Sequence, residues 1–170
     1  FMFLLAAFEL LLYEYTGQTD FVVGTPMAVR SLAEMEHVIG LFLNALPLRA
    51  TLDPAGTLDS LLKDVRENCL KAYAHRNFPF EKLVDALRVK RDPGRTPLFQ
   101  VMLNFGSMPA ETLKLGTLRI SPVEIDAAAI SLDFKLSFIE TSGGLSANWD
   151  FKSGLFETDS IAHLAEDVDR

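Results

Sequence analysis

The sequence lacks the residue patterns of the common enzyme and metal-binding classes. Its one cysteine, Cys69, cannot form an internal disulfide, and its three histidines, His37, His75 and His163, lie near neither this thiol nor one another at metal-ligand spacing. It contains no Gly-x-Ser-x-Gly elbow, no phosphate-binding glycine loop, no Gly-x-Gly-x-x-Gly turn and no His-Glu-x-x-His helix. These absences disfavour a disulfide-stapled secreted fold, a zinc site and the chemistry of serine hydrolases, nucleotide-binding enzymes and zinc proteases.

Long apolar runs and an excess of basic charge are missing too. No stretch approaches the roughly 18–20 uninterrupted apolar residues that cross a bilayer, and the apolar start, Phe1 to Phe8, has no basic flank of the kind that marks a signal peptide. Acidic residues outnumber basic ones by 23 to 16, and a net charge of -7 disfavours a protein whose main work is binding nucleic acid. We therefore expect a soluble cytoplasmic protein without a membrane or nucleic-acid partner.

Size and composition predict a globular chain with a core of its own. It has 170 residues, of which 49% are hydrophobic and 23% charged, which suits one domain. Both ends fall within helical patterns, so we expect a piece of a longer protein, truncated at each end. Residues 49–95 hold ten of the 16 Lys and Arg against seven acidic residues. This basic middle segment either faces an acidic partner or forms solvated helix faces, and composition leaves both open.

Hydrophobic spacing predicts three helices in the first hundred residues or so. Phe1 to Tyr15 is interrupted only by Glu9 and Glu14, so a helix there must be buried on several sides. Leu58 to Tyr73 carries the clearest single apolar stripe of the chain. Pro79 opens a further helix, because proline suits the first helical turn.

The remaining apolar runs predict strands. Phe21 to Val23 reads as a buried strand that ends in a turn at Gly24-Thr25-Pro26, and Ile39 to Leu48 as a second interior strand with Asn44 in its middle. After Pro97 the period shifts toward two. Later strands are predicted at Leu98 to Phe105, Leu115 to Glu124, Leu132 to Glu140 and Leu145 to Phe151, before a last helix capped by Thr158. Helices and strands in this order favour an α/β sandwich with a mixed sheet.

Three segments resemble blocks of one known family. Residues 39–49, Ile-Gly-Leu-Phe-Leu-Asn-Ala-Leu-Pro-Leu-Arg, are similar to its Ile-Gly-x-Phe-x-Asn-Thr-Leu-Pro-Leu-Arg segment. Residues 75–81, His-Arg-Asn-Phe-Pro-Phe-Glu, are similar to His-Gln-Asp-x-Pro-Phe-Glu. Residues 91–100 are similar to Arg-Asp-x-Ser-Arg-x-Pro-Leu-Phe-Gln, with Gly94 in place of Ser. Weaker matches at Gly24-Thr25-Pro26 with Arg30, at Asp133 and at Leu155-Phe156 complete the set. Order and spacing agree with the C-terminal half of a condensation domain from nonribosomal peptide synthetases.

The resemblance implies a fold and an activity. It implies a chloramphenicol-acetyltransferase-like lobe over residues 1–170, the second of two in a pseudodimer, with a tunnel between the lobes where two carrier-borne substrates meet. The expected reaction is amide formation between an acyl or peptidyl donor and an aminoacyl acceptor, and the partners are the N-terminal subdomain, carrier domains and an adenylation domain. The family's His-His-x-x-x-Asp-Gly motif does not occur in this sequence. We therefore expect no catalytic residue in this chain and no activity from it alone.

Site residues follow from the matched blocks. Asn44 is the best tunnel-facing candidate, because a lone amide in an apolar strand needs a partner, and either a pantetheine amide or neighbouring backbone satisfies it. Gly24, Thr25 and Pro26 are expected in a loop at the tunnel floor, or in a plain turn. His75 is interpreted as the end of a helix rather than a base. The other block residues are expected to be structural, with the Arg and Asp residues forming ion pairs that pin a loop to the sheet: Gly40, Arg49, His75, Pro79, Phe80, Glu81, Arg91, Asp92, Arg95 and Pro97.

Two functions remain open from the sequence. The first is part of a peptide-bond-forming condensation domain, which binds no cofactor directly because its substrates arrive on the phosphopantetheine of carrier domains. The alternative is a noncatalytic condensation-like module that docks a carrier protein or a tailoring enzyme. A free-standing acyltransferase is a weaker third interpretation.

Overall fold

The structure is a computed structural model that describes residues 1–30, 33–90, 92–107, 113–120, 130–141 and 143–168. Its elements run in the order α1 (Met2–Thr16), β1 (Asp20–Ala28), the 3-10 helix η1 (Ala33–His37), β2 (Leu43–Thr51), α2 (Leu58–Ala74), α3 (Phe80–Ala86), β3 (Val101–Ser107), β4 (Leu113–Leu115), β5 (Leu118–Ile120), β6 (Phe134–Thr141), β7 (Gly144–Phe151) and α4 (Thr158–Val168). None of the helices among these residues is both long and apolar enough to cross a bilayer.

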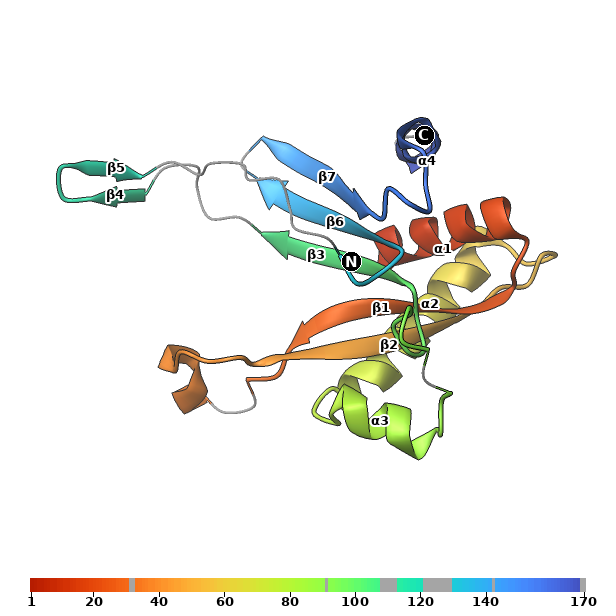
Figure 1. Cartoon of the computed structure of the whole chain (residues 1–170), viewed down its shortest axis with the longest axis horizontal. Helices are drawn as coiled ribbons and strands as arrows, with labels where there is room; N and C mark the ends of the chain where they lie inside the picture. The colour runs from red at the N-terminus through yellow and green to blue at the C-terminus, as the bar shows by residue number, and fades with distance from the viewer. Residues whose placement is uncertain (31–32, 91, 108–112, 121–129, 142, 169–170) are drawn as a thin grey trace.

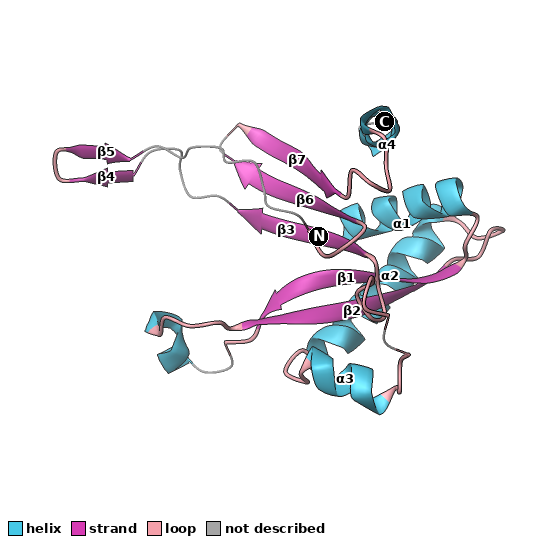
Figure 2. Ribbon diagram, viewed as in Figure 1, coloured by secondary structure: helices cyan, strands magenta, loops and turns pink. Residues whose placement is uncertain are grey.

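Five strands form one mixed sheet, as the sequence predicts. Their order is β2-β1-β3-β6-β7, with β1 antiparallel to β2, parallel pairs at β1–β3 and β3–β6, and β7 antiparallel to β6. The short strands β4 and β5 form a separate hairpin, which projects away from the sheet in Figure 1. Figure 2 shows α1, α2 and α4 at one end of the molecule, with the strands of the sheet fanning out from them, and α3 below β2.

Helix α1 is the centre of the core, which confirms the prediction from its apolar sequence. Leu5 and Phe8 are each 1% exposed and share one cluster with Leu103 and Leu136 of the sheet, which are fully buried. The same cluster takes in side chains of α2 and α4. A helix without a polar face is stable here because three neighbours cover it.

Helix α2 is the amphipathic helix that its stripe predicts. It starts with a capping box, in which the side chains of Thr57 and Ser60 each accept from the other's backbone N–H. Its buried side chains, Val65 and Cys69, face α1 and the sheet, whereas its charged residues lie in solvent. The helix ends at His75, which is its C-terminal cap.

Two strand predictions are wrong in detail. Gly24, Thr25 and Pro26 are not a turn or loop, because β1 continues through them to Ala28 and pairs with β2 along its whole length. Beyond Gly24 the pairing of β1 with β3 stops, and a strand bordered on one side tolerates a proline. The strand predicted from Ile39 begins only at Leu43, and β2 is an edge strand rather than an interior one.

The segment before β2 is exposed, against its apolar sequence. Ile39 is fully exposed and Leu41 is 87% exposed. The Arg30 guanidinium holds this segment from the end of β1: it donates to the carbonyl oxygens of Met35 and Val38 and lies 4.4 Å from the centre of the Phe42 ring. Apolar residues here predict burial that this chain alone does not provide.

The later part follows the predicted order with shifted ends. Strands β3, β6 and β7 are confirmed, and β4 and β5 fall within or beside the predicted strand at Leu115 to Glu124, whose last residues lie outside the described part. Helix α4 begins at Thr158 itself, and the carbonyl of Glu157 before it accepts from Ser160 and Ile161, so Thr158 is the first helical residue rather than the cap.

Candidate functional site

Asn44 connects the first two sequence blocks. Its Nδ2 donates to the carbonyl oxygens of Arg76 and Phe78 at 2.9 and 2.8 Å, and its Oδ1 accepts from the backbone N–H of Phe80 at 3.1 Å. Both amide protons and one oxygen lone pair are therefore used on backbone groups more than thirty positions away. One lone pair of Oδ1 remains for a ligand, so a contact with a pantetheine amide stays a prediction.

The Asn44 amide also caps α3 from another part of the chain. Pro79 stands at the N-cap of α3 and has no side-chain hydrogen bond to offer the first turn. Asn44 supplies the missing acceptor through the Phe80 N–H, which would otherwise be one of the unsatisfied donors of a helix start. Figure 1 shows α3 beside β2, where it covers an otherwise open sheet edge.

Two aromatic rings continue the connection from α3 to β1. The centres of the Phe80 and Phe99 rings lie 5.4 Å apart, and Phe99 is 2% exposed. A Cβ placed on Gly24 would lie 2.6 Å or less from three carbons of the Phe99 ring, so only glycine allows this approach. Gly24 is therefore needed for packing between two blocks, which the sequence does not reveal.

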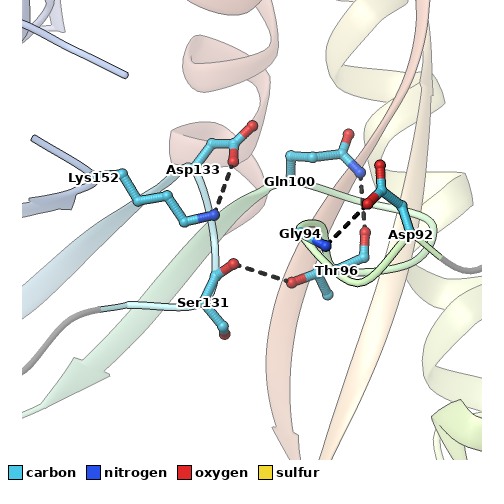
Figure 3. A network of polar contacts seen from close by, with 7 residues as sticks. All are labelled: Asp92, Gly94, Thr96, Gln100, Ser131, Asp133 and Lys152. Atoms are coloured by element: carbon cyan, nitrogen blue, oxygen red, sulfur yellow. Dashed lines mark hydrogen bonds and ion pairs between the residues drawn. The ribbon is translucent and has the colours of Figure 1, made fainter. Parts of the chain in front are cut away.

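The third block is fastened to the start of β6 by polar contacts, shown in Figure 3. Thr96 Oγ1 donates to the Ser131 carbonyl at 3.4 Å, and Gln100 Nε2 donates to the Thr96 carbonyl at 3.0 Å. Asp133 donates its backbone N–H to the Gln100 carbonyl, and its carboxylate pairs with Lys152 Nζ at 3.2 Å. We call the set Gly24, Asn44, Phe80, Phe99 and Gln100, which links all the matched blocks, the motif cluster.

The aspartate of that block acts within its own loop. Asp92 Oδ1 accepts from the Gly94 N–H at 2.9 Å, which stabilises the turn before Pro97. Arg91 lies outside the described residues, so the predicted ion pairs of the Arg and Asp residues stay a prediction. Arg95 and Glu81 line a hollow of about 440 Å³ between α3 and this loop.

The remaining predicted residues have ordinary structural surroundings. Arg49 makes a two-pronged pair with Asp20 across β1 and β2, Nε to Oδ1 at 2.8 Å and Nη2 to Oδ2 at 2.6 Å. This contact lowers the pKa of Asp20, and because both side chains are exposed it adds little to stability. His75 ends α2, with its N–H on Ala72 and its carbonyl accepting from Phe78. Gly40 lies against the Phe42 ring.

A small depression borders the motif cluster. It has a volume of about 260 Å³ and is lined by side chains that include Asn44, Asn77, Phe80 and Glu81. A larger cavity, of about 740 Å³, lies between α1, α4 and the first residues of β1, β3 and β6. Its wall includes Leu98, whose backbone has a φ of 70°, an unfavourable value for a side chain of this size.

One titratable group lies deep in the core. Glu9 of α1 is 3% exposed, and loss of water raises the pKa of its carboxyl to about 7. Across the α1–α2 contact, burial and the nearby Glu9 charge raise the pKa of Cys69 to about 11, and burial raises the pKa of Tyr73 to about 12. The sequence places Glu9 in a buried helix but does not predict which way it points, because the helix has no polar face.

Comparisons with known proteins agree on one family. The family model of the condensation domain matches residues 1–170. A linear gramicidin synthase of Brevibacillus parabrevis is 42% identical over 167 residues, which are 97% of this chain and 2% of that protein. Among solved structures, the complex of the X-domain and OxyB from teicoplanin biosynthesis is 28% identical with a TM-score of 0.84, over 98% of this chain and 37% of that one.

A second solved structure supports the fold alone. A four-domain nonribosomal peptide synthetase bound to AMP and glycine is 22% identical with a TM-score of 0.90, over 97% of this chain and 14% of that one. The chain thus spans a small share of each of these proteins. The motif cluster is the part of it where the matched sequence blocks come together.

Proposed function

Because this chain belongs to the condensation domain family, we propose that it forms the second lobe of a condensation domain that makes an amide bond between two carrier-bound substrates. The match of the family model to all 170 residues carries this proposal. The mixed sheet and the motif cluster support it, since the blocks that resemble the family meet in one connected structure. Its partners in this reaction are the N-terminal subdomain, donor and acceptor carrier domains and a neighbouring adenylation domain.

The proposed reaction needs no bound cofactor. The amine nitrogen of the acceptor attacks the carbonyl carbon of the donor thioester, so a C–N bond forms, the C–S bond breaks, and the amine proton leaves to the departing thiolate. Thioesters and amines are already reactive, so orientation of the two arms in a closed tunnel supplies much of the acceleration. The histidine that positions or deprotonates the amine would come from the other lobe, because this chain has no His-His pair.

The basic middle segment provides a surface for an acidic partner. On α2 the side chains of Lys63 and Arg66 are exposed, and Lys71 pairs with Glu67 at 2.7 Å across one helical turn. An acidic carrier domain would be attracted to such a surface, chiefly through its rate of association. This docking belongs to the same proposal, and its dependence on salt tests it.

One experiment tests the proposed function. The complete domain, with both lobes, is mixed with a donor carrier and an acceptor carrier loaded with their thioesters, and the amide product is followed by mass spectrometry of the acceptor. We expect product with the complete domain and none with residues 1–170 alone. Absence of product from a folded complete domain with an intact His-His-x-x-x-Asp-Gly motif contradicts the proposal.

A specific observation favours the alternative of a docking module. The X-domain neighbour was solved in complex with OxyB, so a domain of this fold binds a second protein. If the other lobe lacks its histidine motif, the complete domain would bind a carrier or a tailoring enzyme without forming amides. Carrier binding without product, measured in the same reactions, distinguishes this function from the first.

A further inference from the structure

The two edge strands of the sheet are protected to different degrees. An edge strand exposes unpaired backbone N–H and C=O groups, and proteins usually block it with proline, lysine, a bulge or a covering segment. β2 has such protection, because it contains Pro47 and because α3 lies beside it, held by the Asn44 hydrogen bonds. β7 contains no proline, lysine or arginine, and its pairing with β6 runs over eight residues without a bulge. Within the described part of the chain, β6 is its only neighbour in the sheet, and Figure 1 shows β7 at the rim.

The backbone groups of alternate β7 residues face outward. Lys152, one residue beyond β7, donates its N–H to the Asp133 carbonyl, and the direction of the backbone groups alternates along a strand. The even-numbered residues of β7 therefore bond to β6, and the odd-numbered residues direct their N–H and C=O groups to the open edge. These outward residues are Leu145, Ala147, Trp149 and Phe151. Leu145 is 50% exposed and Ala147 is exposed, so another strand can reach this edge.

A second β7 fits this edge in antiparallel orientation. Outward residues must pair with outward residues, and all of them are paired when Asn148 lies opposite Asn148 of a second copy. The other facing pairs are then Leu145 with Phe151, Ala147 with Trp149 and Ser146 with Asp150. Aliphatic side chains thus meet aromatic ones, on the face where Trp149 and Phe151 pack against the core. The one charged residue of β7, Asp150, meets a hydroxyl and not a second carboxylate, and its charge is already balanced by Lys135 at 2.6 Å.

We propose that β7 is an interaction edge that pairs antiparallel with β7 of a second copy of the domain. The outward residues of both copies give about eight backbone hydrogen bonds, and two five-stranded sheets become one continuous sheet. The contact is one strand wide and smaller than the interface of a stable dimer, so the Kd is on the order of 100 μM. This association is independent of the proposed function, because it needs neither a carrier domain nor an intact histidine motif.

Sedimentation velocity of the complete domain tests this association. The weight-average sedimentation coefficient is measured from about 5 to about 500 μM, a range that brackets the expected Kd. We expect the coefficient to rise with concentration, from the value of a monomer toward that of a dimer. A coefficient that stays at the monomer value over the whole range overturns the inference, whether or not the domain forms amides.

Two variants locate the contact on β7. Ala147→Pro removes an N–H that faces the open edge and leaves the bonds to β6 in place, which is where an edge strand accepts proline. We expect its Kd to be about tenfold higher, because the dimer loses two backbone hydrogen bonds. The matched control Ala147→Ser keeps this N–H, so its Kd should not change. Leu145→Lys places a charge at the edge without altering the backbone, so it should also raise the Kd and decides the question if the proline variant does not fold. An unchanged Kd in the folded variants overturns the inference.

Hydrogen–deuterium exchange identifies the edge directly. The complete domain is labelled at concentrations about tenfold below and about threefold above the Kd from sedimentation. Peptides from β7 should exchange more slowly at the higher concentration, because their outward N–H groups then have acceptors, whereas peptides from α2 should exchange equally at both. Slower exchange elsewhere with β7 unchanged means that the copies meet at a different surface, and this result overturns the inference.

Discussion

Replacement of Glu9 by glutamine should stabilise the α1–α2 contact strongly at pH 8 and only weakly at pH 5. In the unfolded chain this carboxyl loses its proton near the ordinary value of 4.5, whereas in the fold burial raises its pKa to about 7. Between these values the folded state holds a proton that the unfolded state has lost. Stability is therefore highest below pH 4.5 and is lost as the pH rises through 7.

The size of the effect follows from the shift. A difference of about 2.5 pKa units at 1.36 kcal/mol per unit gives about 3 kcal/mol. Two neighbours on α2 cannot offset it, since Cys69 and Tyr73 have pKa values of about 11 and 12 and stay neutral throughout. Glutamine has nearly the same shape and no charge, so it removes this loss above pH 7.

Hydrogen–deuterium exchange of the complete domain measures the change locally. Wild type and Glu9→Gln are compared at the same pH, so the intrinsic exchange rates cancel. At pH 8 peptides from α1 and α2 should exchange about a hundredfold more slowly in the variant, and at pH 5 the difference should shrink to about fourfold, because pH 5 lies only just above the unfolded-state pKa of 4.5. Equal exchange at pH 8, or the same difference at both pH values, would refute the assignment of a buried, largely protonated carboxyl.

Three further predictions concern the motif cluster and the docking surface. Asn44→Ala removes three hydrogen bonds and the cap of α3. The local stability of this helix should therefore fall by about 2 kcal/mol, which hydrogen–deuterium exchange measures as faster exchange of its amides. The control Asn68→Ala, which removes one exposed hydrogen bond, should have no measurable effect. Gly24→Ala should lower stability by about 1–3 kcal/mol in a urea titration, but Gly106→Ala, with nothing within 4 Å, should not show this loss. Carrier binding to the complete domain should weaken as salt is raised from low ionic strength, and an affinity independent of salt would exclude residues 49–95 as an electrostatic docking surface.

The sequence predicts which helices and strands form better than it predicts where each of them begins and ends. The apolar run of α1 and the stripe of α2 have one explanation each, and the structure confirms both. The turn expected at Gly24-Thr25-Pro26 is wrong because glycine and proline usually break strands, and here the glycine is required by the Phe99 ring and the proline follows the end of the β1–β3 pairing. Both reasons are tertiary, and no local pattern contains them.

In the candidate site too, some features follow from a local sequence pattern and others depend on tertiary contacts. The sequence identifies Asn44 because a lone amide in an apolar strand must be satisfied, and the structure shows backbone partners for it on the segment from Arg76 to Phe80. The contacts that fasten Thr96 and Gln100 to the start of β6 could not be predicted in this way, because they use backbone carbonyls and amides of segments that lie far apart in the sequence.

This difference shows what the residues of the matched blocks do in this lobe. Residues of the matched blocks contact mainly other parts of this lobe. The Asn44 amide hydrogen-bonds to the start of α3, the Phe99 ring packs on Gly24, and the Gln100 carbonyl accepts from the Asp133 N–H. A side chain whose donors and acceptors are already used has little left for a ligand. The blocks therefore build a rigid wall over β1 and beside β2.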